Sequence, residues 1–290
     1  MTRASMTRPL SQDMIRFGLL ATRGQLRALG HTSLQLQRET ADHVVWPIGR
    51  SWLAHPGADH AAMRAVALHG RLAASSALAS HGVWVTRSSG LWVGTPNHAN
   101  HPEPLGPNEH RLWTREHFPD RSDKQWRMSV PDSLLQFAGL GAGCDVVASM
   151  DSALNKGLVT PTELEQVVAL LPRRLRRLLS GVDGRAQSGL ETLLRLAAEA
   201  EGWNVQIQVA ISGVWRVDVL IDGWLVIELD GARWHDDDQS RDEDCRRDAE
   251  LTLLGYRYHR FRSRQVLDAM PLCLAVIRTI LASGRPAAGG

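Results

Sequence analysis

The sequence has few cysteines and no long apolar segment. Its three cysteines, Cys144, Cys245 and Cys273, are far apart and form no CxxC pair, so they indicate neither a disulfide framework nor a cysteine zinc site. No apolar run approaches the ~20 residues of a membrane span, and residues 1–16 lack the apolar stretch of a signal peptide. We therefore expect a cytoplasmic protein without a membrane partner.

Lysine is almost absent, because Lys124 and Lys156 are the only two and 31 of the 33 basic residues are arginine. The net charge of +2 carries no global nucleic-acid signature, so only local clusters of arginine can indicate phosphate contacts. A content of 43% hydrophobic and 22% charged residues excludes a largely disordered chain. The length of 290 residues predicts two or three compact units.

Helix signals dominate the first 55 residues. Spaced apolar residues predict a helix over 12–21, and two capping boxes, Thr22-Arg-Gly-Gln25 and Thr32-Ser-Leu-Gln35, predict two further helix starts. Residues 44–52 then read as a two-stranded ribbon that turns at Ile48-Gly49-Arg50. Three helices followed by a ribbon predict a winged helix.

The third helix, residues 33–40, would be the recognition helix of such a unit. Gln35, Gln37 and Arg38 could reach bases or phosphates from it, and Arg50 could do so from the wing. The alternative is a helical packing used for protein contacts. The segment from Gly18 to Gly30, followed by a short helix and a wing, resembles the N-terminal domain of AbiEi-type abortive-infection antitoxins, which implies DNA binding at a promoter.

Four arginines in five residues, from Arg173 to Arg177, form the densest basic cluster of the chain. They follow a predicted helix that starts at Thr160-Pro-Thr-Glu163. Arg173 and Arg174 are therefore candidates for contacts to a DNA backbone, and the alternative is a solvated helix face in a connector.

Acidic residues interrupt apolar strands near the C-terminus. The pattern predicts a helix over 188–202 and strands over 205–209, 215–221 and 224–230. Asp218 lies within the second of these strands, and Glu228 and Asp230 end the third. Because a buried aspartate is costly without compensation, we expect a divalent metal, Mg²⁺ or Mn²⁺, whose bound water could attack a phosphodiester.

The hairpin between these strands decides whether the carboxylates share a face of the sheet. A two-residue turn at Asp222-Gly223 would place Asp218 opposite Ile227, on the wrong face. A three-residue loop over 221–223 would align Asp218 with Val226 and hence with Glu228. The chemistry requires the second arrangement.

This constellation resembles the PD-(D/E)XK nucleases, and more narrowly the very-short-patch-repair-type endonucleases, over residues 185–270. The resemblance lies in Glu191, Asp218, the string Val226-Ile-Glu-Leu-Asp-Gly-Ala-Arg-Trp-His235 and the pair Arg247-Asp248. It implies metal-dependent hydrolysis of a nucleic-acid backbone, with Asp218 as principal metal ligand, Glu228 or Asp230 as its neighbour, and His235 as acid or base.

One departure from the family pattern concerns charge. Asp230 stands where the motif lysine is expected, so the stabilising cation would come from His235, Arg246 or Arg247. Each residue also has a structural interpretation: Glu191 completes a capping box with Ser188, His235 packs beside a tryptophan, and the two arginines balance nearby acidic residues.

These observations predict an α+β or α/β protein with a winged helix at residues 1–55, a mixed middle domain at 56–178 and a restriction-endonuclease-like α/β/α domain at 179–290. The predicted function is a metal-dependent DNA endonuclease guided by its winged helix. The rival is a DNA-binding regulator, similar to an antitoxin, that keeps the nuclease fold without turnover. The expected partners are DNA and either a second copy of the chain or a cognate toxin.

Overall fold

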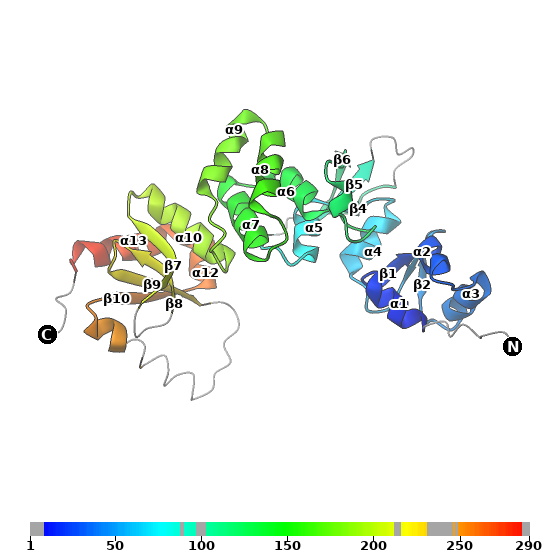
Figure 1. Ribbon diagram of the computed structural model, residues 1–290, viewed down its shortest axis with the longest axis horizontal. Helices are drawn as coiled ribbons and strands as arrows, with labels where there is room; N and C mark the ends of the chain where they lie inside the picture. Colours follow the sequence, from blue (N-terminus) through cyan, green and yellow to red (C-terminus); the bar gives the residue numbers. More distant parts are fainter. Residues whose placement is uncertain are drawn as a thin grey trace. The chain divides into compact units, whose positions relative to one another are not determined.

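The computed structural model describes residues 9–87, 90–96, 103–211, 216–230, 246 and 249–285 of the chain (Figure 1). Helices and three small sheets alternate along it, which confirms the predicted mixed α/β class. The chain divides into two compact units, one of Met1–Gly82 with Arg87–Leu140 and one of Val83–Thr86 with Gly141–Gly290. No helix in the described ranges has the length and apolar character needed to span a bilayer.

The first unit begins with a three-stranded sheet and three short helices. The sheet is antiparallel with the strand order β1-β3-β2. Both predicted helix starts are confirmed, since Thr22 closes a full capping box with Gln25 and the Thr32 hydroxyl accepts from the Gln35 N–H at 3.1 Å. The elements are α1 (Leu10–Arg16), β1 (Leu20–Thr22), α2 (Arg23–Ala28), α3 (Ser33–Ala41), β2 (Trp46–Ile48) and β3 (Trp52–Ala54).

The first helix is shorter than the sequence pattern predicts. It ends at Arg16, because Gly18 and Leu19 adopt left-handed backbone angles, with φ of 72° and 66°. The chain then enters β1, a strand that the prediction of a helix through residue 21 missed. Pairing with β3 buries Leu20 and Ala21, and this tertiary gain overrides the local helical spacing.

The rest of the first unit continues the same core beyond residue 55. Leu20 and Ala54 share one apolar cluster with residues of the following helices, including Ala65 and Ala77. A second sheet has the order β4-β5-β6. The elements are α4 (His60–Ala67), β4 (Arg71–Leu72), α5 (Ala74–Ser80), β5 (Leu91–Pro96), β6 (Glu109–Thr114), the 3₁₀ turn η1 (Pro119–Arg121) and α6 (Val130–Ala138).

The second unit opens with helices. The predicted start at Thr160 is confirmed by a capping box with Glu163. The long helix α7 packs against α10, so the predicted middle domain of residues 56–178 is divided between the two units. The elements are α7 (Gly143–Asn155), α8 (Pro161–Leu170), α9 (Arg173–Arg176), η2 (Arg177–Gly181) and α10 (Gly189–Ala200).

A four-stranded mixed sheet follows, with the order β10-β9-β8-β7. β10 is parallel to β9, and the other two pairings are antiparallel. The elements are β7 (Val205–Ala210), β8 (Arg216–Ile221), β9 (Leu225–Asp230), β10 (Arg257–Arg262), α12 (Ser263–Asp268) and α13 (Met270–Ala282).

Helices cover both faces of this sheet, as predicted. Leu194 of α10, Val266 of α12 and Ile277 of α13 pack on one face, which we call the α10 face (Figure 1). On the opposite face, Leu251 from the helical segment 249–253 packs on Val226. Two apolar cores therefore sandwich the sheet, and any polar side chain in its middle lies close to buried apolar surface.

Candidate active site

Four polar side chains lie at one level across the C-terminal sheet. Gln208 of β7 and Asp218 of β8 lie at the same level, because the paired residues on either side of them are Ile207 with Val219 and Val209 with Val217. The pairing of β8 with β9, continued by one residue, places Asp218 opposite Glu228, and the parallel pairing of β10 places Arg260 beside Glu228. We call Gln208, Asp218, Glu228 and Arg260 the polar row. The flanking rows are apolar apart from one histidine: Ile207, Val219, Ile227 and His259, and Val209, Val217, Leu229 and Phe261.

The hairpin that sets this register differs from the predicted one. Its three-residue loop is 222–224 rather than 221–223, so Asp218 aligns with Glu228 and not with Val226. Asp222 and Gly223 carry the left-handed angles, with φ of 50° and 74°. Ile221 is fully buried and therefore stays in the strand. This register, continued by one residue, sets Asp218 level with Glu228 on the adjacent strand.

The alternation of side chains between the two faces breaks at the polar row. Val219 packs on the α10 face, whereas Val217, two residues earlier, packs on the opposite face. β7 changes face in the same way between Ile207 and Val209, where Gln208 has a φ of 55°. A left-handed angle at a residue other than glycine is strained, and such strain concentrates at functional sites.

The backbone of β9 holds the Asp218 carboxylate. The N–H of Leu229 donates to Asp218 Oδ2 at 2.9 Å. The side chain thus bonds to the strand that carries Glu228, which fixes one carboxylate oxygen. Such a hydrogen bond to an ionised carboxylate is stronger than a neutral one.

Glu191 reaches the row from α10 and is almost fully buried, with 3% of its surface exposed. Its carboxylate accepts from Gln208 Nε2 at 2.8 Å, from the Gln187 N–H at 3.1 Å and from the Ser188 hydroxyl at 3.0 Å. The Ser188 hydroxyl also caps α10 by accepting from the Glu191 N–H. Glu191 therefore takes part in the cap of α10 and at the same time bonds to Gln208 of the polar row.

Two influences act on the acidity of Glu191. Burial raises the pKa of its carboxyl above the usual range, and the negative charge of Asp218 raises this pKa further. The hydrogen bonds from Gln208, Gln187 and Ser188 oppose both effects. Two carboxylates near each other, one of them buried, form a site that favours a cation.

Glu228 and Asp230 follow Val226 on the face opposite α10, because side chains alternate along β9. Asp230 forms an ion pair with Arg260, with 3.7 Å between Oδ1 and Nε. The Asp230 backbone carbonyl accepts from the Ser263 hydroxyl at 2.7 Å, which ties the end of β9 to the start of α12.

The predicted ligand set of Asp218, Glu228 and Asp230 does not form a closed cluster. Within the described ranges, no group of three or more His, Cys, Asp or Glu side chains is arranged to hold a metal ion. Mg²⁺ commonly takes only one or two carboxylates and keeps several waters. Asp218 and Glu228, hard oxygen donors on adjacent strands, fit that requirement.

The predicted cations divide into those that the structure describes and those that it does not. His235 and Arg247 lie outside the described residues. Arg246 is exposed and forms an ion pair with Glu250, with 3.7 Å between Nη1 and Oε1. In the described part of the chain, the cation beside Glu228 is Arg260, which sequence reasoning missed.

The predicted nucleic-acid contacts lie on the surface. Gln37, Arg38 and Arg50 are exposed in the first unit, and Gln35 is half-buried in the first turn of α3. Arg173 and Arg174 are exposed in α9 of the second unit. Their exposure permits phosphate contacts and equally permits a solvated surface.

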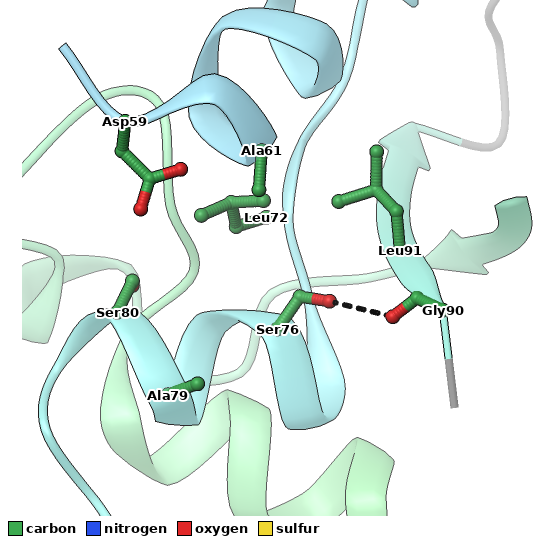
Figure 2. Close-up of a pocket in the computed structure, with 8 residues that line it drawn as sticks. All are labelled: Asp59, Ala61, Leu72, Ser76, Ala79, Ser80, Gly90 and Leu91. Carbon is green, nitrogen blue, oxygen red and sulfur yellow. Dashed lines mark hydrogen bonds between the residues drawn. The ribbon is translucent and has the colours of Figure 1, made fainter. Parts of the chain in front are cut away.

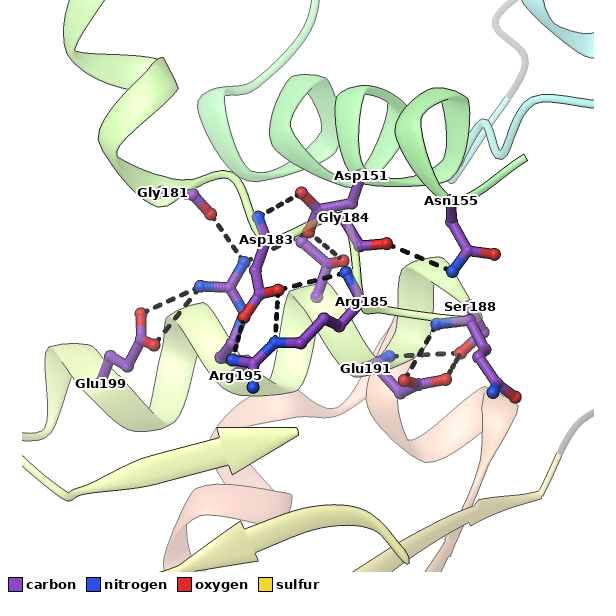
Figure 3. Close-up of polar contacts among 12 residues, drawn as sticks. Asp151, Asn155, Gly181, Asp183, Gly184, Arg185, Ser188, Glu191, Arg195 and Glu199 are labelled. Atoms are coloured by element: carbon purple, nitrogen blue, oxygen red, sulfur yellow. Dashed lines mark hydrogen bonds and ion pairs between the residues drawn. The ribbon is translucent and has the colours of Figure 1, made fainter. Parts of the chain in front are cut away.

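A buried polar network joins α7 to α10 next to Glu191 (Figure 3). Arg195 Nη2 lies 3.2 Å from Asp151 Oδ2, and both residues are at least 95% buried. The Thr192 hydroxyl donates to Asp151 at 2.7 Å, and the Asp183 N–H donates to it at 2.6 Å. α10, which carries Glu191, is thus anchored by polar contacts as well as by apolar packing.

The first unit contains a pocket of about 450 Å³ between α5 and β5 (Figure 2). Asp59 is its only charged lining residue among those described, and this carboxylate caps α4 by accepting from the Ala62 N–H at 2.9 Å. Ser76 donates to the Gly90 carbonyl across it at 3.5 Å. The pocket lacks a set of reactive groups, so it is not a candidate active site.

Comparison with known families agrees with the fold of the C-terminal part of the chain. Residues 191–280 match the model of REase_MTES_1575, a restriction endonuclease-like family. The matched segment begins at Glu191 and includes the whole polar row, so the C-terminal part of the chain is a nuclease-like domain. A search of curated proteins finds no match to the chain.

Sequence reasoning found the carboxylates but missed Gln208 and Arg260. Gln208 lies in the run Val-Gln-Ile-Gln-Val, where alternation suggests only a solvated face. Arg260 lies in Arg257–Arg262, a strand with three arginines in six residues. This local positive charge was the sequence feature that could have pointed to Arg260.

Proposed function

We propose that the chain is a metal-dependent DNA endonuclease that hydrolyses phosphodiester bonds. The observation that carries the proposal is the polar row, which places Asp218 and Glu228 on adjacent strands of a nuclease-like domain. Asp218 and Glu228 would hold Mg²⁺ or Mn²⁺ with Asp230 near them, and the cation would supply a polarised water and neutralise charge on the phosphate.

The chain's own residues prepare this site. The Leu229 N–H orients Asp218, and the Gln208 amide orients Glu191. Preorganised groups of this kind lower the barrier because they need no rearrangement during the reaction. His235 is proposed as the acid or base, on its position five residues after Asp230.

The first 55 residues supply DNA binding in this proposal. The order of α1, β1, α2, α3, β2 and β3, with the sheet β1-β3-β2, supports a winged helix whose recognition helix is α3. Gln35, Gln37 and Arg38 would contact DNA from α3, and Arg50 from the turn between β2 and β3. Arg173 and Arg174 would contact phosphates from α9.

The test is cleavage of plasmid DNA by the wild type and by Asp218→Ala in Mg²⁺ or Mn²⁺. Loss of Asp218 should slow cleavage at least about 100-fold, the scale on which removal of one electrostatic group slows an enzyme. DNA binding should persist, because phosphate contacts elsewhere position the duplex. Asp222→Asn, an exposed position in the same hairpin, should cut at the wild-type rate.

A wild type that cuts DNA with neither metal would contradict the proposal and favour a second function. Asp230, which stands where the motif lysine of the nuclease family is expected, supports that alternative, a DNA-binding regulator without turnover. Its binding should persist in chelator and depend on Gln35, Arg38 and Arg50.

A further inference from the structure

The first unit has a second pocket, of about 600 Å³, beside the turn between β2 and β3. Residues 48–52 of this turn form one wall, and the end of α4 with the start of β4, between residues 66 and 71, forms another. The volume lies within the range of small-molecule sites, roughly 300 to 1,000 Å³. Among the described residues that line the pocket are two arginines, one histidine, two glutamates and one tryptophan.

The wall at the end of α4 is held against the sheet behind it. Gly70 follows His69, which has a left-handed φ of 56°, and leads the chain from α4 into β4. A Cβ atom at Gly70 would lie 2.3 Å from Val93 Cγ1, so this close approach to β5 requires glycine. Trp52, from the other wall, packs on the same apolar cluster as Val66. Both walls therefore belong to one core, and the pocket is preformed.

Arg71 is fixed in this pocket with part of its guanidinium unused. Its Nε donates to the Gln125 carbonyl at 2.7 Å, and its Nη1 donates to Glu116 Oε1 at 2.6 Å. Within the described ranges no group bonds to its Nη2, and 25% of the side chain is exposed. An oriented guanidinium with spare N–H groups is suited to an anionic group such as phosphate.

The other lining groups select the rest of the ligand. Trp52 is half-buried and is the type of side chain on which nucleic-acid bases stack. Arg50 and His69 are exposed and can add contacts to an anion, whereas the exposed Glu103 accepts from N–H or O–H groups. Because carboxylates repel a simple anion, the ligand needs hydrogen-bond donors as well as its negative group. A phosphate, a planar ring and such donors occur together in a nucleotide.

We propose that this pocket binds a single nucleotide. Arg71 binds its phosphate, Trp52 stacks on its base, and Glu103 accepts from its base or sugar. The inference goes beyond the proposed function, because the pocket lies in the first unit and does not involve the polar row. The same chemistry has two sources, a nucleotide free in solution and a nucleotide of a DNA strand.

Isothermal titration calorimetry of the full chain with the 5′-monophosphates of adenosine, guanosine, cytidine and thymidine tests the free nucleotide. At least one should bind more tightly than about 1 mM, and inorganic phosphate and the matching nucleoside should each bind at least about tenfold more weakly. Trp52→Leu keeps an apolar side chain on the core and should weaken binding about tenfold, the scale of one lost base–aromatic stack. Trp52→Phe keeps a ring and should weaken it less.

Arg64 supplies a matched control for Arg71. It lies in the same unit and also pairs with a glutamate, with 2.7 Å between its Nε and Glu109 Oε1, but it does not line the pocket. Arg71→Gln should weaken nucleotide binding at least about tenfold, the scale of a hydrogen bond to a charged group, whereas Arg64→Gln should keep the wild-type affinity. Each variant breaks one arginine–glutamate ion pair, so equal losses of affinity would assign the effect to folding and overturn the phosphate contact.

A second arm tests a nucleotide within DNA. Fluorescence anisotropy compares binding of a short duplex that carries one unpaired nucleotide with binding of the fully paired duplex. A preference for the unpaired nucleotide that Trp52→Leu abolishes would assign the pocket to nucleotides of a strand, and calorimetric binding without that preference would assign it to free nucleotides.

The inference is overturned if neither arm shows binding, if phosphate alone binds as tightly as every nucleotide, or if Trp52→Leu and Arg71→Gln both bind like the wild type. Both arms are run in chelator, where no metal-dependent cleavage occurs. Their outcome is therefore separate from that of the plasmid cleavage assay, and either proposal can fail without the other.

Discussion

Gln208 combines a strained backbone with a polar contact to Glu191. Its φ of 55° is costly for any residue with a side chain, and its amide donates to the buried carboxylate at 2.8 Å. The left-handed conformation costs about 1 to 2 kcal/mol in a residue other than glycine. The chain therefore sacrifices stability at the position that orients a candidate catalytic group.

Two substitutions separate the strain from the contact. Gln208→Gly and Gln208→Ala both delete the amide, but glycine also relieves the backbone, so Gln208→Gly should be the more stable variant by about 1 kcal/mol in urea unfolding. Both variants should lose about tenfold in cleavage rate, the equivalent of a hydrogen bond worth about 1.4 kcal/mol. Wild-type cleavage in both would show that the amide does not support Glu191.

Short helices in the first unit depend on a buried hydrogen-bonded pair at the start of α3. His31 precedes the cap residue Thr32, and its Nε2 lies 2.8 Å from Oδ2 of Asp13 on α1. Both residues are at least 97% buried, and His31 Nδ1 has no hydrogen-bond partner within the described ranges. The pair ties α1 to the proposed recognition helix.

His31→Ala should destabilise the protein by about 3 kcal/mol, because it leaves the Asp13 carboxylate buried without its partner. Asp13→Asn keeps a hydrogen-bond acceptor and should cost less. His60→Ala, an exposed position at the start of α4, should stay within about 0.5 kcal/mol of the wild type. Urea unfolding followed by circular dichroism measures all three, and equal losses for His31 and His60 would refute the structural role.

A buried carboxylate, that of Asp151, takes part in the polar network of the second unit, although burial disfavours its charged form. Burial raises the pKa of Asp151 to about 6, although hydrogen bonds from Thr192 and Asp183 and the charge of Arg195 oppose the rise. An unfolded aspartate titrates near 3.9. The folded state thus holds its proton more tightly, so this contribution to stability is complete below about pH 4 and is lost as pH rises through about 6.

Asp151→Asn removes that titration. Because about two pH units separate the folded and unfolded values, the wild type should lose about 2 kcal/mol of unfolding free energy relative to Asp151→Asn between pH 4 and pH 7. Urea unfolding of both proteins at pH 4, 5.5 and 7 measures the difference. A wild type that gains stability over the variant across this range would show that Arg195 lowers the pKa of Asp151 instead.

Local signals in the sequence were sufficient to predict many of the helices and strands. Thr22, Thr32 and Thr160 each mark a real helix start, because a hydroxyl followed by Gln or Glu three residues later caps the backbone within one turn. The strands 205–209 and 224–230 appear within one residue of the predicted bounds. β1 was missed, because its partner β3 lies about thirty residues away in the chain.

The sequence by itself was sufficient to single out the candidate carboxylates, since acidic residues inside apolar strands are unusual wherever the strands lie. Only the tertiary structure decided that Gln208 and Arg260 join them. Their places depend on the register of three strand pairings, and the burial of apolar side chains such as Ile221 and Leu225 selects that register. A row across a sheet joins residues that are ten or more positions apart, and no local pattern specifies such a row.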